Sequence, residues 1–220
     1  MSDMGSERPI RQWNEGVDPI VAFDFDGTLT IRDSFTEFLR WRAGRRGWAM
    51  GLARMTPAVA TYARTRDRGR IKAASVRVFL KGVPRTELEA DASAFCEQAW
   101  DRFMRPDALA CWDEWGRRGA HRVIVTASPE ITIAPFAARL GADALLGTTL
   151  VMDADDRVTG RFSSANCRAA EKVRRLRTAY GRNIRLTAAY GDTSGDTEML
   201  AIADHKGFRE FTGRPAKARG

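Results

Sequence analysis

The stretch that decides the fold of this chain is VAFDFDGTLT, residues 21–30. An apolar run that begins at Ile20 leads directly into Asp24 and Asp26, with one phenylalanine between them and a glycine and threonine after them. Acidic residues are depleted from strands, and burying an unpaired carboxylate is costly. A buried strand ending in two aspartates therefore predicts a counter-charge or a ligand at its carboxyl end.

Length and composition limit the class of protein. The chain has 220 residues, of which 44% are hydrophobic, so it can bury one substantial core. Its net charge of +8 favours anionic partners: nucleic acid, an acidic membrane surface or a phosphorylated metabolite. Much of that charge lies in short arginine runs, which we interpret as solvated faces.

Two further features concern the compartment. No segment reaches the ~18 uninterrupted apolar residues that a membrane span needs. Cys96, Cys111 and Cys167 are widely spaced and form no CxxC pair, which suggests neither a disulfide framework nor a zinc site. We therefore expect a cytoplasmic protein.

Short apolar runs and helical patterns alternate along the chain. The runs predict buried parallel strands at residues 20–25, 121–126 and 184–190. Helical patterns cover residues 107–118, 135–140 and 169–180, and residues 150–162 have the pattern of a hairpin. This alternation predicts an α/β fold, a Rossmann-like parallel sheet with right-handed crossovers.

The connection between the first two strands is unusually long. Residues 34–102 read as helices without a strand, and Ser34 with Glu37 has the spacing of a capping box. Ordinary crossovers are far shorter, so this segment is predicted to be an inserted helical cap. The core would then comprise residues 19–33 and 103–211, with a flexible leader at 1–18 and a basic tail at 212–220.

Polar clusters follow the predicted strands or lie at loop ends. They occupy residues 24–28, 126–129, 168–175 and 191–196. Because ligands bind at the carboxyl ends of strands in an open parallel sheet, these clusters can converge. Strand periodicity points Asp24 and Asp26 to the same side, where their carboxylates would repel each other unless a cation lay between them. Asp192 supplies another carboxylate, and Mg²⁺ prefers such oxygen ligands.

These motifs resemble the haloacid dehalogenase (HAD) superfamily of phosphohydrolases over most of the chain. The resemblance rests on residues 24–30 (the DxDGT signature), Thr126 after an apolar strand, a downstream basic residue, and residues 191–196 (the GDxxxD signature). The cap, residues 126–130 and the hairpin are most similar to the phosphoserine-phosphatase-like branch, subfamily IB, whose helical cap is of the C1 type.

The resemblance implies a role for each matching residue. Asp24 would be the nucleophile that becomes an aspartyl phosphate, and Asp26 would protonate the leaving oxygen and later activate water. Thr126 would hydrogen-bond the phosphoryl group. Mg²⁺ would be held by the Asp24 side chain, the Asp26 main-chain carbonyl and Asp192, with Asp196 in support. Further phosphate or substrate contacts are expected from Gly27, Thr28, Ala127 and Ser128, although Ser128 could equally be a turn residue before Pro129.

Two assignments stay open at this point. The cation that balances the phosphate is either Lys172 or Arg168, because the usual lysine position of phosphoserine phosphatases is Ala170 here. Asp33 lies where those enzymes carry an acidic residue thought to meet the substrate amine, but it could instead cap the helix that follows. The cap arginine for a substrate carboxylate has no clear counterpart, so a different small phosphorylated metabolite is as good a candidate as phosphoserine.

Other functions have weaker support. A phosphotransferase or mutase of the same superfamily would keep both aspartates, whereas dehalogenases lack the second. A module that binds nucleic acid or anionic membranes would use the basic charge, but acidic groups at its site would repel phosphates, so we expect no nucleic-acid partner. The chain has no P-loop, and His121 and His205 are predicted to be structural. The sequence does not specify an oligomeric state.

Overall fold

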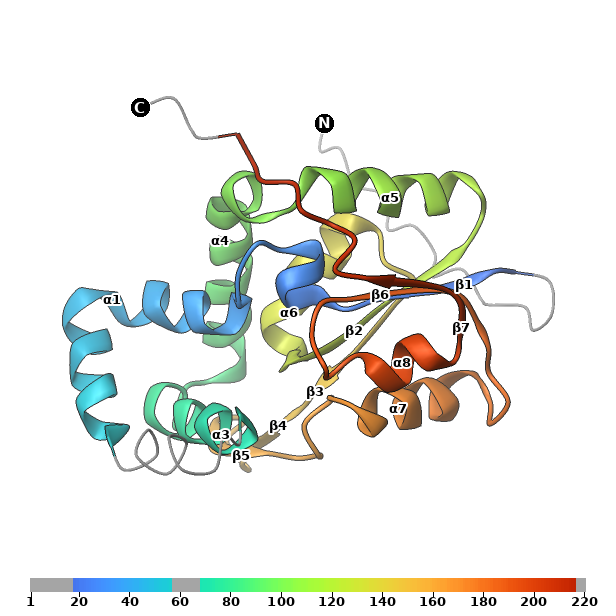
Figure 1. Ribbon diagram of the computed structural model, residues 1–220. Helices are drawn as coiled ribbons and strands as arrows, with labels where there is room; N and C mark the ends of the chain where they lie inside the picture. The colour runs from blue at the N-terminus through green and yellow to red at the C-terminus, as the bar shows by residue number, and fades with distance from the viewer. Residues whose placement is uncertain (1–17, 57–67, 217–220) are drawn as a thin grey trace, which may run out of the picture.

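The computed structural model describes residues 18–56 and 68–216, and its centre is a parallel sheet of five strands in the order β3-β2-β1-β6-β7 (Figure 1). The strands are β1 (Ile20–Phe23), β2 (His121–Pro129), β3 (Ala144–Thr148), β6 (Leu186–Gly191) and β7 (Ala203–Phe208). Every neighbouring pair in this sheet is parallel. The predicted α/β class with a parallel sheet is confirmed. The edge strands β3 and β7 were not predicted.

Helices cover both faces of the sheet. On one face lie α5 (Pro106–Arg117) and α6 (Glu130–Leu140), and on the other lie α7 (Ala170–Tyr180) and α8 (Thr197–Ala201) (Figure 1). Each face has its own apolar cluster: Trp112 and Phe136 belong to the first, and Leu176 and Met199 to the second. Strand side chains alternate between the two, so β1 is buried on both sides.

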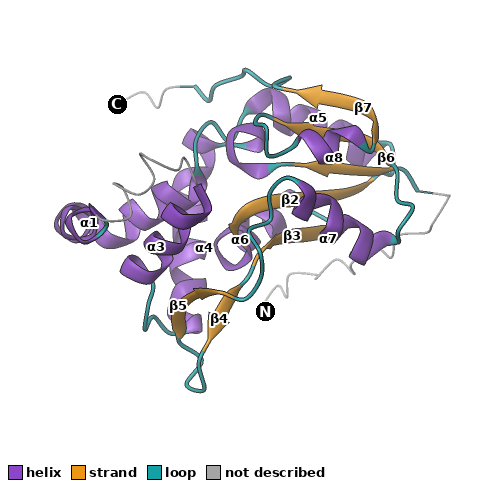
Figure 2. Cartoon of the chain, turned by 60° about the horizontal axis from the view of Figure 1, so that its bottom comes forward, coloured by secondary structure: helices purple, strands orange, loops and turns teal. Residues whose placement is uncertain are grey.

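The insertion between β1 and β2 contains α1 (Ser34–Arg54), α3 (Arg68–Phe79) and α4 (Arg85–Phe103) (Figures 1 and 2). The chain leaves and re-enters the core side by side, because Ile31 N donates to Phe103 O at 2.9 Å. Helix α4 packs on core helix α6, with the Trp100 and Phe136 rings stacked 6.1 Å apart. The cap is therefore anchored to the core along α4.

A hairpin joins the far end of the cap to the core. Its strands β4 (Leu150–Met152) and β5 (Val158–Phe162) are antiparallel, as predicted. The loop before α4 extends it, because Val158 N donates to Val83 O and Gly82 N donates to Val158 O. The hairpin was predicted to belong to the core, but its backbone partners lie in the cap.

Helix α1 begins differently from the prediction. The capping box of Ser34 and Glu37 is wrong: Asp33 is the N-cap, and its carboxylate accepts a hydrogen bond from Thr36 N at 2.7 Å. Ser34 instead turns its hydroxyl to Asp26. Farther along, Gly44 kinks α1 with φ 64° and ψ 177°, a conformation that is essentially restricted to glycine.

No helix among the described residues is long and apolar enough to cross a membrane. The predicted leader lies almost wholly outside the described residues, which begin at residue 18, and the last part of the predicted tail lies beyond residue 216.

Candidate active site

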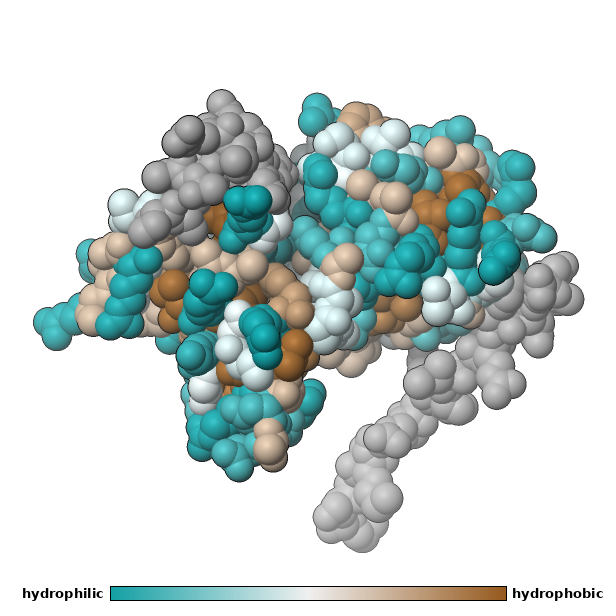
Figure 3. Space-filling model, turned by 90° about the horizontal axis from the view of Figure 1, so that it is seen from below, coloured by the Kyte–Doolittle hydropathy of each residue, from teal (hydrophilic) through white to brown (hydrophobic). Residues whose placement is uncertain are grey.

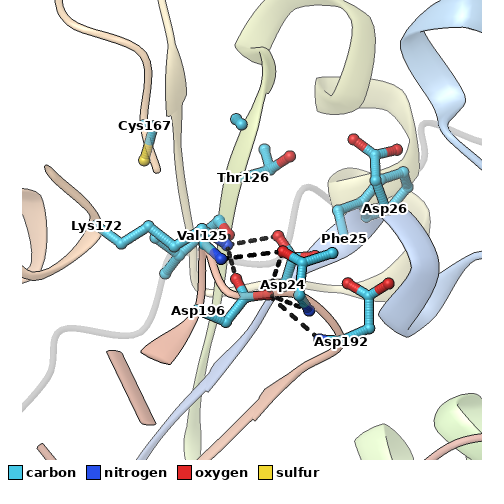
Figure 4. Close-up of polar contacts among 12 residues, drawn as sticks. Asp24, Phe25, Asp26, Val125, Thr126, Cys167, Lys172, Asp192 and Asp196 are labelled. Atoms are coloured by element: carbon cyan, nitrogen blue, oxygen red, sulfur yellow. Dashed lines mark hydrogen bonds and ion pairs between the residues drawn. The ribbon is translucent and has the colours of Figure 1, made fainter. Parts of the chain in front are cut away.

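The two aspartates of the opening motif occupy different surroundings (Figure 4). Strand β1 ends at Phe23, and Asp24 follows it with its backbone N–H bonded to Tyr190 O at 2.9 Å. The next residues form an irregular helical turn, η1 (Phe25–Leu29), in which Gly27 takes a φ of 85°. The prediction that a strand reaches Phe25 is wrong, because β1 ends at Phe23. The carboxylates of Asp24 and Asp26 nevertheless line one cavity.

Lys172, on the first turn of α7, supplies the counter-charge for Asp24. Its Nζ donates to Asp24 Oδ1 at 2.5 Å, to Asp196 Oδ1 at 2.7 Å and to Val125 O at 2.6 Å. The side chain is fully buried, and burial alone would lower its pKa. Asp24 and Asp196 more than offset this and raise the pKa of Lys172, so it stays protonated. The alternative cation, Arg168, donates instead to Ser194 Oγ at 3.0 Å.

Three carboxylates gather beside this lysine. Asp24, Asp192 and Asp196 each offer an oxygen within 4.8 Å of the others. Burial, opposed in part by Lys172, raises the pKa of Asp24 to about 7. Burial, and then Asp196, raises the pKa of Asp192 as well. Asp196 behaves oppositely: burial would raise its pKa, but Lys172 and the Thr193 donors hold it below the usual range.

This cluster fits a hard divalent cation. Asp192 Oδ1 is buried and has no hydrogen-bond partner among the described residues, so nothing there compensates this carboxylate oxygen for its burial. An all-oxygen set of carboxylates is the type of site that Mg²⁺ takes. Gly27 lies directly against it, since a Cβ atom there would fall 2.2 Å from Asp192 Oδ2. The glycine is therefore required by space as well as by its positive φ.

Asp26 is held by hydroxyl and backbone donors. Its Oδ1 accepts from Ser34 N at 2.7 Å and from the Ser34 hydroxyl, and its Oδ2 accepts from Ser128 Oγ at 2.5 Å. Lys72, on cap helix α3, donates in turn to Ser128 Oγ at 3.3 Å. Burial, and then Asp33, raises the pKa of Asp26, so its protonated form is favoured relative to an exposed aspartate.

A cavity of about 720 Å³ lies between the core and the cap and reaches both aspartates. Its core side includes Asp24, Asp26, Lys172 and Asp192, and its cap side is formed by residues of α1 and α3. This volume is in the range of small-molecule sites. The cavity therefore has the acidic cluster on one side and the insertion on the other.

Comparison with known proteins agrees with this geometry. The family model described as haloacid dehalogenase-like hydrolase matches residues 21–201. This chain belongs to the haloacid dehalogenase-like hydrolases. Protein CicA of Caulobacter vibrioides (strain NA1000 / CB15N) is 58% identical over 197 residues, which cover 90% of this chain and 88% of that protein.

Solved structures show the same fold at low sequence identity. A protein of unknown function from Bordetella pertussis Tohama I has a TM-score of 0.69 and 22% identity, with 84% of this chain and 86% of that chain covered. A phospho-aspartyl intermediate analogue of phosphoserine phosphatase has a TM-score of 0.56 and 20% identity, with coverages of 84% and 83%. The expected likeness to phosphoserine-phosphatase-like HAD hydrolases is confirmed at the level of fold.

The structure brings most of the predicted site residues of this HAD hydrolase together. Among the expected phosphate or substrate contacts, Gly27, Asp33 and Ala127 line the cavity. Thr126 is fully buried beside the aspartates, and its Oγ1 accepts from Ser128 N at 3.0 Å (Figure 4). Thr28 is buried, its hydroxyl has no hydrogen-bond partner among the described residues, and it is not among the residues that line the cavity.

Three residues at the site were missed or misread in the sequence. Ser34 was read as a helix cap, whereas its side chain binds Asp26. Lys72 reaches Ser128 from the cap, and Arg105 donates to Gly27 O and Thr30 O at 3.2 Å each. The two basic residues lie outside any motif. Lys72 reaches the cavity from cap helix α3, and Arg105 reaches it from the start of core helix α5.

Proposed function

We propose that this HAD hydrolase is a magnesium-dependent phosphomonoesterase that cleaves a phosphorylated metabolite through an aspartyl phosphate on Asp24. The observation that carries the proposal is the unequal environment of the two aspartates. Asp24 is paired with Lys172 in the acidic cluster, whereas Asp26 is held by Ser34 and Ser128 under the cap. This difference supports a nucleophilic role for Asp24 and a proton-transfer role for Asp26.

Asp24 and Asp26 then act in both halves of the reaction. An Asp24 carboxylate oxygen attacks phosphorus, the ester P–O bond breaks, and Asp26 gives its proton to the leaving alkoxide. In the second half a water attacks the same phosphorus, Asp26 takes its proton, and the bond from Asp24 to phosphorus breaks. The raised pKa of Asp26 supports its retaining a proton for the first half.

Charge neutralisation comes from Lys172 and a metal ion. Asp24, Asp192 and the main-chain carbonyl of Asp26 would hold Mg²⁺, with Asp196 in support, and the bound ion would neutralise charge on the phosphoryl oxygens. Lys172 fixes the position of Asp24 and Asp196 through its ammonium group. Phosphoryl transfer depends mainly on such positioning and electrostatic stabilisation, so this set is chemically sufficient.

Other observations support the same proposal. The structural neighbour described as a phospho-aspartyl intermediate analogue of phosphoserine phosphatase shares this fold. We also propose a cytoplasmic location, which Cys96, Cys111 and Cys167 support because all three are free thiols.

The test is hydrolysis of p-nitrophenyl phosphate with and without Mg²⁺, scored both as nitrophenol and as inorganic phosphate. We expect activity that needs the metal and falls to background in Asp24→Asn. Asp204→Asn is the matched control, because Asp204 is exposed and pairs with Arg185 at the surface. Activity that survives Asp24→Asn, or no activity on any phosphomonoester, would refute the proposal, and nitrophenol release without inorganic phosphate would indicate a phosphotransferase.

A further inference from the structure

The two sides of the cavity differ in chemistry. The core side presents carboxylates and Lys172, whereas the cap side presents large apolar side chains, namely Phe35, Trp48, Leu52, Met55 and Ile71. The side chains of this wall are held by packing, since Trp48 stacks on Phe79 with ring centroids 5.1 Å apart and Met55 is buried. The part of a substrate that lies away from its phosphate would therefore meet hydrocarbon.

The basic side chains around the cavity are already bound to protein groups. Of the basic residues that line its described part, Lys172 binds Asp24, Lys72 donates to Ser128, Arg168 to Ser194, and Arg105 to main-chain carbonyls. Arg32 lies 3.9 Å from Glu37 and is mostly exposed. A substrate carboxylate would have to compete for each of these cations.

The acidic residue expected to meet a substrate amine is also engaged. Asp33 accepts from Thr36 N as the cap of α1, so its carboxylate already has a structural role. The acidic group that would bind the amine of phosphoserine is therefore used as a helix cap. The cations that would bind its carboxylate already have partners in the protein. Phosphoserine has little to gain from this site.

The apolar side continues to the surface. Leu52 lines the cavity and is still 44% exposed, so the apolar wall reaches solvent. The space-filling view shows brown apolar surface among hydrophilic residues on the cap side of the molecule (Figure 3). A chain that extended from the phosphate along this wall would have room to leave the cavity.

We propose that the substrate is a phosphomonoester of an apolar, extended alcohol, with its phosphate at Asp24 and its hydrocarbon against the cap wall. This inference rests on the proposed phosphatase function and specifies its substrate class. Burial of hydrocarbon would favour longer alkyl chains over shorter ones, by about fourfold in affinity for each methylene removed from water. An alcohol that carries charges gains nothing from that wall.

The first experiment measures kcat/KM for ethyl, butyl, hexyl and octyl phosphate below their micellar concentrations, with phosphoserine alongside. We expect kcat/KM to rise along the series, mainly through KM, by about 50-fold from ethyl to octyl phosphate if three methylenes are buried. The value for octyl phosphate should also exceed that for phosphoserine. A flat series, or phosphoserine as the best substrate, would overturn the inference while leaving the phosphatase intact. The same assay is run on phosphatidic acid in phosphatidylcholine vesicles. If phosphatidic acid is hydrolysed and dissolved octyl phosphate is not, the substrate is an ester held in a membrane.

The second experiment separates binding from turnover. Calorimetry with octylphosphonate and ethylphosphonate, which cannot be hydrolysed, measures the apolar contribution even if catalysis fails. Leu52→Asp should reduce the octyl-to-ethyl affinity ratio by about tenfold or more, because it places a carboxylate in the wall. Met50→Asp is the matched control, since Met50 lies on the same helix, is 58% exposed and does not line the cavity. Equal ratios in wild type and Leu52→Asp would contradict the proposal.

Discussion

Lys172 is the residue whose buried ammonium group compensates the charge of the acidic cluster. It contacts two carboxylates and a main-chain carbonyl, and it is as buried as the core phenylalanines. Removing one partner of a buried ion pair leaves an uncompensated charge, which costs more than the pair contributes. The stability of the metal-free protein should therefore depend on this side chain.

Lys172→Met should lower the free energy of unfolding by about 3–5 kcal/mol in EDTA, and Mg²⁺ should restore part of it. Urea unfolding with and without the metal measures both effects. Lys206→Met is the control, because Lys206 is exposed on β7 and its loss should change stability by less than about 0.5 kcal/mol. Equal effects of the two substitutions would show that Lys172 is not the counter-charge.

Asp107 ties the segment after β7 to helix α5. Its Oδ2 accepts from Thr212 N at 2.8 Å and Gly213 N at 2.6 Å. Partial burial raises its pKa, but the Gly213, Thr212 and Ala108 N–H donors outweigh it and hold the pKa of Asp107 below its usual range. A depressed folded-state pKa gives stabilisation that is present above the unfolded value and is lost as pH falls through the folded value.

The attachment at Gly213 should therefore persist at neutral pH and be lost only at a pH below about 4, the value at which an unperturbed aspartate titrates. The amide chemical shift of Gly213, followed from about pH 2 to about pH 7, measures the loss of this hydrogen bond. Asp107→Asn should remove the pH dependence. A Gly213 shift that titrates identically in both proteins would exclude Asp107 as its cause.

Single residues also show what the sequence can and cannot predict. Asp24 and Asp192 were predicted because each follows a strand at the carboxyl edge of one sheet. Asp196 was implied by the resemblance to the HAD superfamily, and Lys172 was one of two candidate cations. The hydrogen-bond partners of Asp26 were not predicted, because they depend on the chain leaving β1 at Phe23. The contacts of Ser34 and Lys72 require the cap to be folded, so no local pattern contains them.

At the scale of elements, the strands differ in how clearly the sequence marks them. The central strands β1, β2 and β6 are nearly continuous apolar runs because both faces are covered. The edge strand β7 reads ADHKGF and is exposed at most positions, and β3 is short and contains glycine. These edges lack an apolar period, which explains why they were missed.

The kink in α1 offers a matched pair of substitutions. Gly44 lies in a conformation that only glycine adopts readily, and nothing lies within 4 Å of the place where its Cβ would be. Gly44→Ala should cost about 1–3 kcal/mol through backbone strain alone. Gly47→Ala, in a helical part of the same element, should instead stabilise by about 0.5–1 kcal/mol. Urea unfolding of both measures the signs, and two changes of the same sign would contradict the kink.

The cap should close unevenly if it moves during catalysis. Helix α4 packs on core helix α6, with the Trp100 and Phe136 rings stacked, whereas α1 and α3 carry the apolar wall of the cavity. With Mg²⁺ and a phosphate analogue bound, hydrogen exchange should slow in α1 and α3 and stay unchanged in α4. Uniform protection of all three helices would show a rigid movement of the whole insertion, and no protection would count against closure.

At the scale of the whole molecule, the basic charge is dispersed rather than gathered at the site. Several surface arginines pair with acidic neighbours, such as Arg185 with Asp204 and Arg117 with Glu114. The cavity itself carries a cluster of carboxylates, which repels a polyanion unless a metal is bound. This distribution favours a small phosphorylated substrate over nucleic acid.

The division of the chain into a core and a cap at residues 34–102 remains an interpretation. The family match at residues 21–201 spans both parts. Helix α4 ends at Phe103, one residue beyond the predicted boundary, and packs with core helix α6 in a single apolar cluster. Sequence periodicity could locate the insertion, but not how closely it joins the core, because that depends on aromatic contacts between distant segments.

The central claim is that Asp24 receives the phosphoryl group while Asp26 moves the protons. Acid-quenching the enzyme during turnover of a phosphomonoester with Mg²⁺, followed by peptide mass spectrometry, tests it most directly. We predict a phosphoryl group on the peptide that contains residues 21–30, located at Asp24, that is absent from Asp24→Asn and accumulates in Asp26→Asn with a good leaving group. An active enzyme whose phosphoryl group is found on another residue, or on Asp26, would contradict the claim.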